Sequence, residues 1–181
     1  MTTLGEGIFK RCSSLTNIYV STGNPVYYSI DGILYSKTKK SILVYPRGKK
    51  NKSFIIPDGI QCIASSAFYF NQHLVIPESA TLFEYDSLVF DDKYSLREIH
   101  IGNKEPQNVT LGEADQEYIN EFWEEFSGFE DFTQSFDKAG NVMLYVPYGS
   151  GHKYRRDKRF KGFKEIRIER TNTSLARNKL H

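Results

Sequence analysis

The side chains that most often carry chemistry are few and scattered in this sequence. Four histidines lie without the short spacings that metal ligands require: His73, His100, His152 and His181. His100 alternates with apolar neighbours, which predicts a side chain on the solvent face of a strand. We therefore expect no metal site and no cofactor.

Nucleophile and phosphate motifs are also missing. Residues 149–151 read Gly-Ser-Gly, but they lack the spacing and the strand-to-helix context of a nucleophile elbow. Asp91 and Asp92 are adjacent loop acids without the alternating oxygen ligands of a calcium site. No phosphate-binding or dinucleotide-binding glycine motif occurs. The sequence therefore predicts no enzyme and no catalytic residue.

Two cysteines, Cys12 and Cys62, are too few for a disulfide framework and have no metal-ligand spacing. No apolar run approaches the roughly 18 residues of a membrane span. The first residues, Met-Thr-Thr-Leu-Gly-Glu, have neither the basic nor the apolar part of a signal peptide. We expect no membrane span and no signal peptide in this chain.

Charge is uneven along the chain, although the net charge of +2 is too small to indicate a nucleic-acid or membrane partner. Residues 113–137 contain nine acids and no Lys or Arg, whereas residues 153–179 contain eleven basic residues and three acids. Mutual neutralisation of the two segments is the favoured interpretation, and a binding role for either one is the alternative. Aromatic residues within the basic segment have the spacing of core anchors, so no nucleic-acid partner is expected: Tyr154, Phe160 and Phe163.

A recurring apolar pattern indicates a repeat protein. Three copies begin with a Phe that stands six residues before a Leu: Phe9, Phe68 and Phe90. The first and third copies continue as L-x-x-I-x-I or V in residues 15–20 and 96–101. In the second copy the strand follows Leu74 directly, so about two residues are missing.

The alternation of apolar residues predicts short strands with one buried face. One unit cannot bury that face alone, so the units are expected to stack as a ladder of parallel strands. A further strand is expected at residues 54–56, and Pro57 and Pro77 end their strands at equivalent places. Residues 29–35 and 41–46 flank a polar turn and predict a β-hairpin.

Three strings resemble BspA-like leucine-rich repeats of bacterial cell-surface proteins: residues 29–36 (SIDGILYS), 56–60 (IPDGI) and 64–68 (ASSAF). The family's unit runs I-P-x-x-V-x-x-I-G-x-x-A-F-x-x-C-x-x-L-x-x-I. Cys12 stands at its Cys position, three residues before Leu15, and Asn71 and Lys93 occupy that position in the other copies. The resemblance implies that this side chain faces inward and satisfies backbone groups of the loop.

The C-terminal part resembles a terminal module of such proteins, because residues 144–150 read LYVPYGS. The later aromatic and apolar residues match the module's Y…W-x-x-F-x-x-I, with a Phe in place of the Trp: Tyr154, Phe160, Phe163 and Ile166. The resemblance covers residues 3–102 and 141–169, and departs from the family in its few, degenerate repeats and its expanded residues 103–140. It implies an exported or surface-anchored binding protein and brings no catalytic residues.

Residues 114–126 predict an amphipathic helix with one aromatic face: Tyr118, Ile119, Phe122, Trp123 and Phe126. A cap over the end of the repeat core is favoured, because solenoids need caps. A partner-binding helix is the alternative, because Trp and Phe anchor interfaces. Residues 149–157 predict a short helix, and residues 160–168 a turn followed by a closing strand.

These patterns predict a β-rich α+β solenoid. We expect a short leucine-rich-repeat ladder in residues 1–102, with an inserted β-hairpin at about 26–46. A C-terminal cap containing the amphipathic helix is expected in residues 103–169, and a polar tail in residues 170–181.

The predicted function is a non-enzymatic module that binds a protein or glycan partner through its strand face and loops. An extracellular or cell-surface location follows from the resemblance alone. Candidate contacts are aromatic residues expected on outer faces: Tyr19, Tyr27, Tyr28 and Tyr148. The alternative is a structural spacer or cap of a longer surface protein, with no ligand of its own and with association through an open repeat end.

Overall fold

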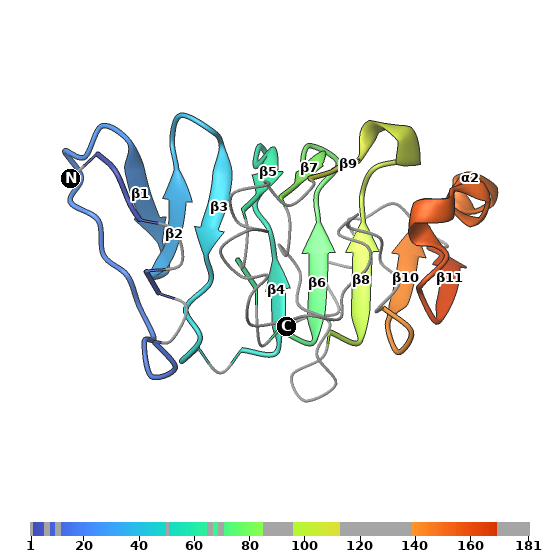
Figure 1. The fold of residues 1–181 in the computed structure, drawn as a ribbon, viewed down its shortest axis with the longest axis horizontal. Helices are drawn as coiled ribbons and strands as arrows, with labels where there is room; N and C mark the ends of the chain where they lie inside the picture. The colour runs from blue at the N-terminus through green and yellow to red at the C-terminus, as the bar shows by residue number, and fades with distance from the viewer. Residues whose placement is uncertain are drawn as a thin grey trace, which may run out of the picture.

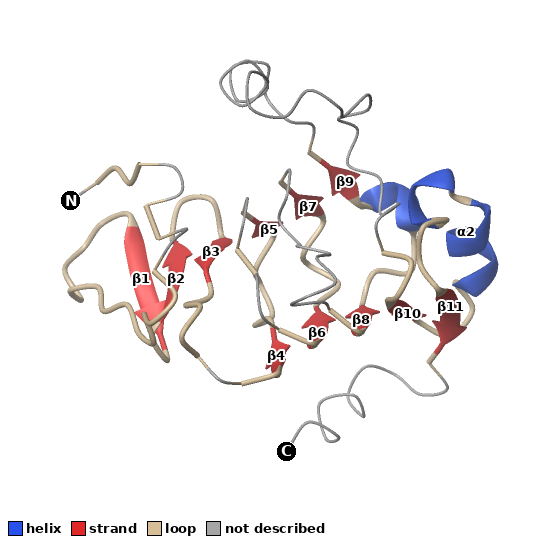
Figure 2. Ribbon diagram, turned by 60° about the horizontal axis from the view of Figure 1, so that its bottom comes forward, coloured by secondary structure: helices blue, strands red, loops and turns tan. Residues whose placement is uncertain are grey.

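The computed structural model describes residues 2–5, 8–9, 12–49, 51–64, 67–68, 71–84, 96–112 and 139–169. Its strands form two sheets that face each other (Figures 1 and 2). From β3 (Ser41–Val44) to β10 (Met143–Val146) the chain passes from one sheet to the other with each successive strand. This β-rich solenoid confirms the fold that the repeat pattern predicts.

The first sheet has six strands in the order β1-β2-β3-β5-β7-β9. Their bounds are Tyr27–Ile30, Ile33–Ser36, Ser41–Val44, Cys62–Ile63, Leu82–Phe83 and Thr110–Leu111. The pairs β1–β2 and β2–β3 are antiparallel, whereas every later pair is parallel. The sheet therefore changes from a meander to a repeat ladder at β3.

The second sheet has five strands in the order β11-β10-β8-β6-β4, and all of them are parallel. Their bounds are Glu165–Ile168, Met143–Val146, Glu98–Ile101, His73–Ile76 and Ser53–Ile55. Ile55 pairs with Val75, so Pro57 and Pro77 follow their strands at equivalent places, as predicted.

Among the described residues, three short helical segments lie at the end of the solenoid that holds β10 and β11, here called its C-terminal end: η1 (Pro106–Asn108), α2 (Gly151–Arg156) and η3 (Lys158–Phe160). With β11, α2 confirms the predicted short helix and closing strand. The predicted amphipathic helix at 114–126 and the predicted tail at 170–181 lie outside the described residues.

The hydrophobic core fills the space between the two sheets. The second sheet contributes two rows of inward residues, and in each row one residue comes from each of β6, β8 and β10: Leu74, Ile99 and Leu144, then Ile76, Ile101 and Val146. The first sheet contributes Ile42, Ile63 and Phe83. Full burial of each such side chain stabilises the fold by about 1.5–3 kcal/mol, so these rows hold neighbouring repeats together.

The prediction of one strand at residues 29–35 is wrong. The chain turns at Asp31 and Gly32, which have φ values of 50° and 74°, and β1 pairs with β2 across this turn. Two successive left-handed residues make a tight hairpin turn, for which Asp-Gly is a favoured pair. The predicted hairpin between residues 33–36 and 41–44 is confirmed as β2 and β3.

The first repeat copy does not form the predicted strand at residues 15–20. Ile18 donates its N–H to the carbonyl of Gly32 at 2.9 Å, but the N–H of Val20 is bonded to the Ser29 hydroxyl at 3.1 Å. A side-chain acceptor replaces a backbone carbonyl there, so no regular ladder develops.

The second copy has a different register from the predicted one. Leu74 pairs with Ile99, so it is a strand residue itself and not the equivalent of Leu96. Nine positions separate Phe90 from Ile99 and six separate Phe68 from Leu74, so the second copy is shorter by three residues.

The inward orientation that the resemblance implies for Cys12 is also wrong. Cys12 is exposed, and its Sγ lies 4.0 Å from the carbonyl of Ile8. Asn71, at the same repeat position, is 2% exposed and donates its Nδ2 to the carbonyl of Asn51 at 3.4 Å. Asn71 has the loop of the preceding repeat beside it, whereas Cys12 lies at the end of the described ladder.

Candidate binding surface

The outer face of the five-stranded sheet carries the side chains that alternate with the core residues. Because the strands are in register, equivalent positions form rows across the sheet. One row comprises Ser53, His73, Glu98, Met143 and Glu165. The next row comprises Ile55, Val75, His100, Tyr145 and Arg167.

Two histidines and two glutamates form a connected chain on this face. Nδ1 of His73 lies 3.1 Å from Oε2 of Glu98, and Nε2 of His100 lies 3.8 Å from the same oxygen. Nδ1 of His100 is hydrogen-bonded to Oε1 of Glu169, which directly follows β11. The contact with Glu169 passes over β10, so the chain of side chains connects β6 and β8 with the end of β11.

An aromatic and cationic group continues this surface towards the C-terminal edge. The rings of His100 and Tyr145 are stacked with centroids 4.4 Å apart and an interplanar angle of 3°. Arg167 donates to Glu165 at 3.0 Å and occupies the position on β11 that pairs with Tyr145 on β10. The Arg167 guanidinium holds the pKa of the Glu165 carboxyl below its usual range. Donors, acceptors and ring surface therefore lie side by side, as in sites that recognise polar ligands.

The sequence placed His100 correctly on the outer face of its strand, but not in a bland environment. Its side chain is only 19% exposed, because Tyr145 and Glu169 flank it. Sequence reasoning did not bring His73, Glu98 and Glu169 together with it. The sequence signal that could have found this group is the spacing between repeats, because His73 pairs with Glu98 once the register of β6 and β8 is known.

The four predicted contact tyrosines do not form one group. Tyr19, at 83% exposure, and Tyr27 line a common cavity at the N-terminal end. Tyr28 packs against the core and stacks on Tyr35 at 5.0 Å. Tyr148, at 78% exposure, follows β10 near the opposite end of the molecule (Figure 1).

The N-terminal cavity has a volume of about 160 Å³ and a mainly apolar lining. Its walls are Leu4, Phe9, Ile18, Val20 and Leu34, with Tyr19, Ser21, Asn24 and Tyr27. A cavity of this size accommodates about one benzene-sized group. It is large enough for one apolar side chain and too small for an extended ligand.

Side chains with catalytic or redox potential have structural partners in the described part of the chain. The buried hydroxyl of Ser150 donates to the carbonyl of Pro147 at 2.7 Å, which ties up the serine of the Gly-Ser-Gly string. Burial raises the pKa of the Cys62 thiol to about 11, so this cysteine is a poor nucleophile.

Within the described ranges, no three His, Cys, Asp or Glu side chains are placed to hold a metal ion. In the same residues, no helix has the length and apolar character needed to cross a membrane.

Neither family models nor curated proteins match this chain. Among solved structures it is similar to a leucine-rich repeat protein from Eubacterium ventriosum, with a TM-score of 0.53 and 16% identity over 91% of this chain and 46% of that one. It is also similar to the pneumococcal vaccine antigen PcpA, with a TM-score of 0.37 and 14% identity over 86% of this chain and 51% of that one.

The first of these likenesses shows that the fold is of the leucine-rich-repeat type. The chain spans about half the length of both proteins, at 46% and 51%. The two-sheet fold and this likeness define the class of protein as a leucine-rich-repeat-like solenoid.

Proposed function

We propose that this chain is a non-enzymatic binding module of a BspA-like bacterial cell-surface protein. In this proposal the outer face of the five-stranded sheet contacts a protein or glycan partner. The observation that carries it is the connected group on that face, in which His100 lies between Glu98, Glu169 and the ring of Tyr145.

The composition of this face supports recognition more than structure alone. Besides the apolar Ile55 and Val75, of which Val75 is 3% exposed, the outer positions hold stacked rings and ion pairs across four strands. Aromatic residues and Arg are enriched where proteins bind other proteins. The flat, extended surface of a solenoid suits a partner that spans several repeats.

The test is a binding screen of the purified chain against extracellular-matrix proteins and a glycan array. For each saturable hit we compare the double variant Tyr145→Ala/Arg167→Ala on the sheet face with Tyr19→Ala/Lys39→Ala, which also removes one tyrosine and one positive charge, near the N-terminal end. We expect at least tenfold weaker binding in the first variant, about 1.4 kcal/mol, and little change in the second. Loss confined to the second variant, or no saturable hit from folded protein, would contradict the proposal.

A structural spacer is a second candidate, and a separate observation favours it. Ile8 is 47% exposed, and the apolar cavity lies at the same end of the solenoid. End-to-end packing of repeats would cover this surface. Sedimentation over a range of concentrations should then show association that Ile8→Ser weakens. A monomer at all concentrations would argue against this candidate.

A further inference from the structure

A strongly basic surface covers the C-terminal end of the solenoid. Residues 151–169 contain eight Lys or Arg and three Asp or Glu, a net charge of +5. The whole chain carries only +2, so the remaining residues sum to −3. The positive charge is thus concentrated on α2, η3 and β11, at one end of the molecule (Figure 1).

Some of these cations hold the fold together. Arg159 donates to the carbonyls of Pro106 and Val109 at 2.8 and 2.6 Å. Lys153 is paired with Glu105, and Arg155 donates to the carbonyl of Ile166 on β11. Local structure therefore accounts for these basic residues without a ligand.

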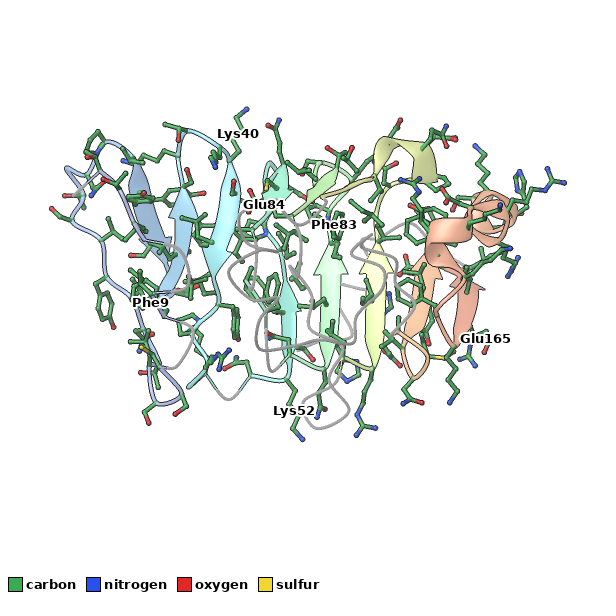
Figure 3. The ribbon with its side chains drawn as sticks, viewed as in Figure 1. Phe9, Lys40, Lys52, Phe83, Glu84 and Glu165 are labelled. Atoms are coloured by element: carbon green, nitrogen blue, oxygen red, sulfur yellow. The ribbon has the colours of Figure 1, made fainter. Side chains whose placement is uncertain are left out.

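Three further cations that lie close together in the sequence have no such role. Arg156, Lys158 and Lys161 are exposed, and their side chains form no hydrogen bond or ion pair with the described part of the chain. They lie within six residues, at the end of α2 and around η3. Nitrogen-tipped side chains project outward around α2 (Figure 3). Tyr154 and Phe160 are buried and anchor the backbone of residues 154–160. The positive charges on this segment and next to it are therefore held in fixed positions at the surface.

We propose that this basic surface binds a sulfated polysaccharide, with Arg156, Lys158 and Lys161 as the sulfate contacts. Free guanidinium and ammonium groups on an anchored turn attract a linear polyanion by charge complementarity. Tyr148, exposed in the turn that leads into α2, provides an aromatic face for a sugar ring. This surface lies outside the His73–Glu98–His100 group, so the inference does not depend on the proposed function of the sheet.

The burial of the neighbouring aromatics argues against a nucleic acid. Proteins that bind single strands stack successive bases on exposed aromatic side chains. The three aromatics within the basic segment are 0%, 1% and 7% exposed: Tyr154, Phe160 and Phe163. Among the described residues from 139 to 169, Tyr148 is the one strongly exposed ring, and charge with a single ring suits a sulfated sugar chain better than a run of bases.

The test is binding of the whole chain to heparin, a sulfated polysaccharide, measured by titration calorimetry at several salt concentrations. The variant Arg156→Glu/Lys158→Glu/Lys161→Glu should bind at least tenfold more weakly. For this variant the plot of log Kd against log salt concentration should have a slope smaller by about 2, because each anion that the protein neutralises adds about 0.7–0.9 to that slope. Circular dichroism checks that the variant keeps the fold.

The matched control is Lys39→Glu/Lys40→Glu/Lys52→Glu, which makes the same change in net charge. Lys40 and Lys52 lie well away from Glu165, which is on β11 (Figure 3). The control should bind heparin within about twofold of the unmodified chain, because exposed charges outside the contact surface contribute little. Equal losses in both variants would show that net charge alone is responsible and would overturn the proposal.

The remaining arms separate other polyanions. Equally tight binding of desulfated heparin, of a single-stranded oligonucleotide or of phosphatidylserine vesicles would overturn the assignment to a sulfated polysaccharide, as would no heparin binding at low salt. The sheet variant Tyr145→Ala/Arg167→Ala separates the two proposals. It should weaken binding of the partner that contacts the sheet, whereas its affinity for heparin should stay within about twofold, a change that the loss of one positive charge explains.

Discussion

The two ends of the solenoid are closed to very different degrees. Residues 139–169 at the C-terminal end contribute seven side chains to the buried core: Ala139, Val142, Leu144, Val146, Tyr154, Phe160 and Phe163. Of the described residues between 2 and 20, none belongs to that core. There Ile8 is 47% exposed, and an apolar cavity of about 160 Å³ is left.

The C-terminal end is also closed by polar contacts. The hydroxyl of Tyr154 donates to the carbonyl of Asn103 at 2.8 Å, and Arg159 satisfies the carbonyls of Pro106 and Val109. The end of this repeat ladder is thus closed by buried apolar side chains together with hydrogen-bond donors to the backbone of the loop between β8 and β9, because buried carbonyls must find partners. The N-terminal end has less of both.

The largest expected effect tests the apolar plug. Phe160 is 1% exposed and packs edge-on against Tyr154 at 4.8 Å between ring centroids. Phe160→Ala should lower the free energy of unfolding by about 3–5 kcal/mol, because it leaves a cavity. Urea titration followed by circular dichroism measures this. Phe9→Ala, at the half-exposed end, is the control and should cost about 1 kcal/mol; equal losses would remove the contrast between the ends.

The polar closure depends most on one guanidinium. Arg159→Ala removes donors to two backbone carbonyls and to Asp157, so it should destabilise the fold by about 2–3 kcal/mol. Arg156→Ala on the neighbouring exposed position should change stability by less than about 0.5 kcal/mol. The same urea titrations compare them. Similar losses in the free energy of unfolding for both variants would show that the hydrogen bonds of Arg159 do not stabilise this end of the solenoid.

The buried hydroxyl of Tyr154 should have a smaller effect. Tyr154→Phe keeps the ring and leaves the carbonyl of Asn103 without its donor, at a cost of about 1–2 kcal/mol. Tyr148→Phe, where the hydroxyl is at the surface, should leave the melting temperature unchanged. Thermal unfolding of both variants decides, and an unchanged Tyr154→Phe protein would assign this closure to packing alone.

The ion pair of the cap predicts a pH dependence. The hydrogen bond from Arg159 holds the pKa of Asp157 below its usual range, so the folded state favours the charged carboxylate. This contribution is complete above the ordinary pKa of about 3.9 and is lost as the pH falls through the lowered folded value. Asp157→Asn should therefore cost about 1 kcal/mol at pH 7 and almost nothing at the acid end.

Urea titrations of both proteins at pH 7 and at successively lower pH values measure this difference. Asn keeps the size of the side chain, so the comparison isolates the charge. A difference that stayed constant as the pH fell would show that the hydrogen bond, and not the charge of Asp157, supports the turn.

The smallest expected effect lies at the other end. Ile8→Ser should change the free energy of unfolding by less than about 0.5 kcal/mol, because the side chain is already half-exposed. Urea titration of a dilute sample checks this. A loss above 2 kcal/mol would show that the N-terminal end is sealed as firmly as the C-terminal end.

Local sequence signals predicted the strand of the third repeat and the β2–β3 hairpin. The apolar alternation in residues 96–101 became β8, and the hairpin formed around residues 36–40. The errors came where a local pattern has two readings. Apolar residues stand on both sides of Asp31 and Gly32, so residues 29–35 looked like one strand although Asp-Gly marks a tight turn. The six-residue spacing before Leu74 hid a shortened repeat.

The candidate site was much less predictable than the fold. Exposed aromatics could be guessed, and Tyr19 and Tyr148 are indeed at the surface. Tyr28 was expected there too, but it packs on Tyr35, because the unexpected turn folds β1 back onto β2. The group around His100 had no local signal, because its partner Glu169 is 69 residues further along the chain.

By itself, the sequence determined which residues alternate between the core and the outer face, because that periodicity is a property of each short strand. It also determined that single repeats must stack, since none can bury its apolar face alone. Only the tertiary structure decided which outer residues meet. That outcome depends on the register between strands, which the packing of the buried face sets and which the lengths of the repeats alone do not give. For this reason His73, Glu98, His100 and Glu169 form one surface that only the folded ladder reveals.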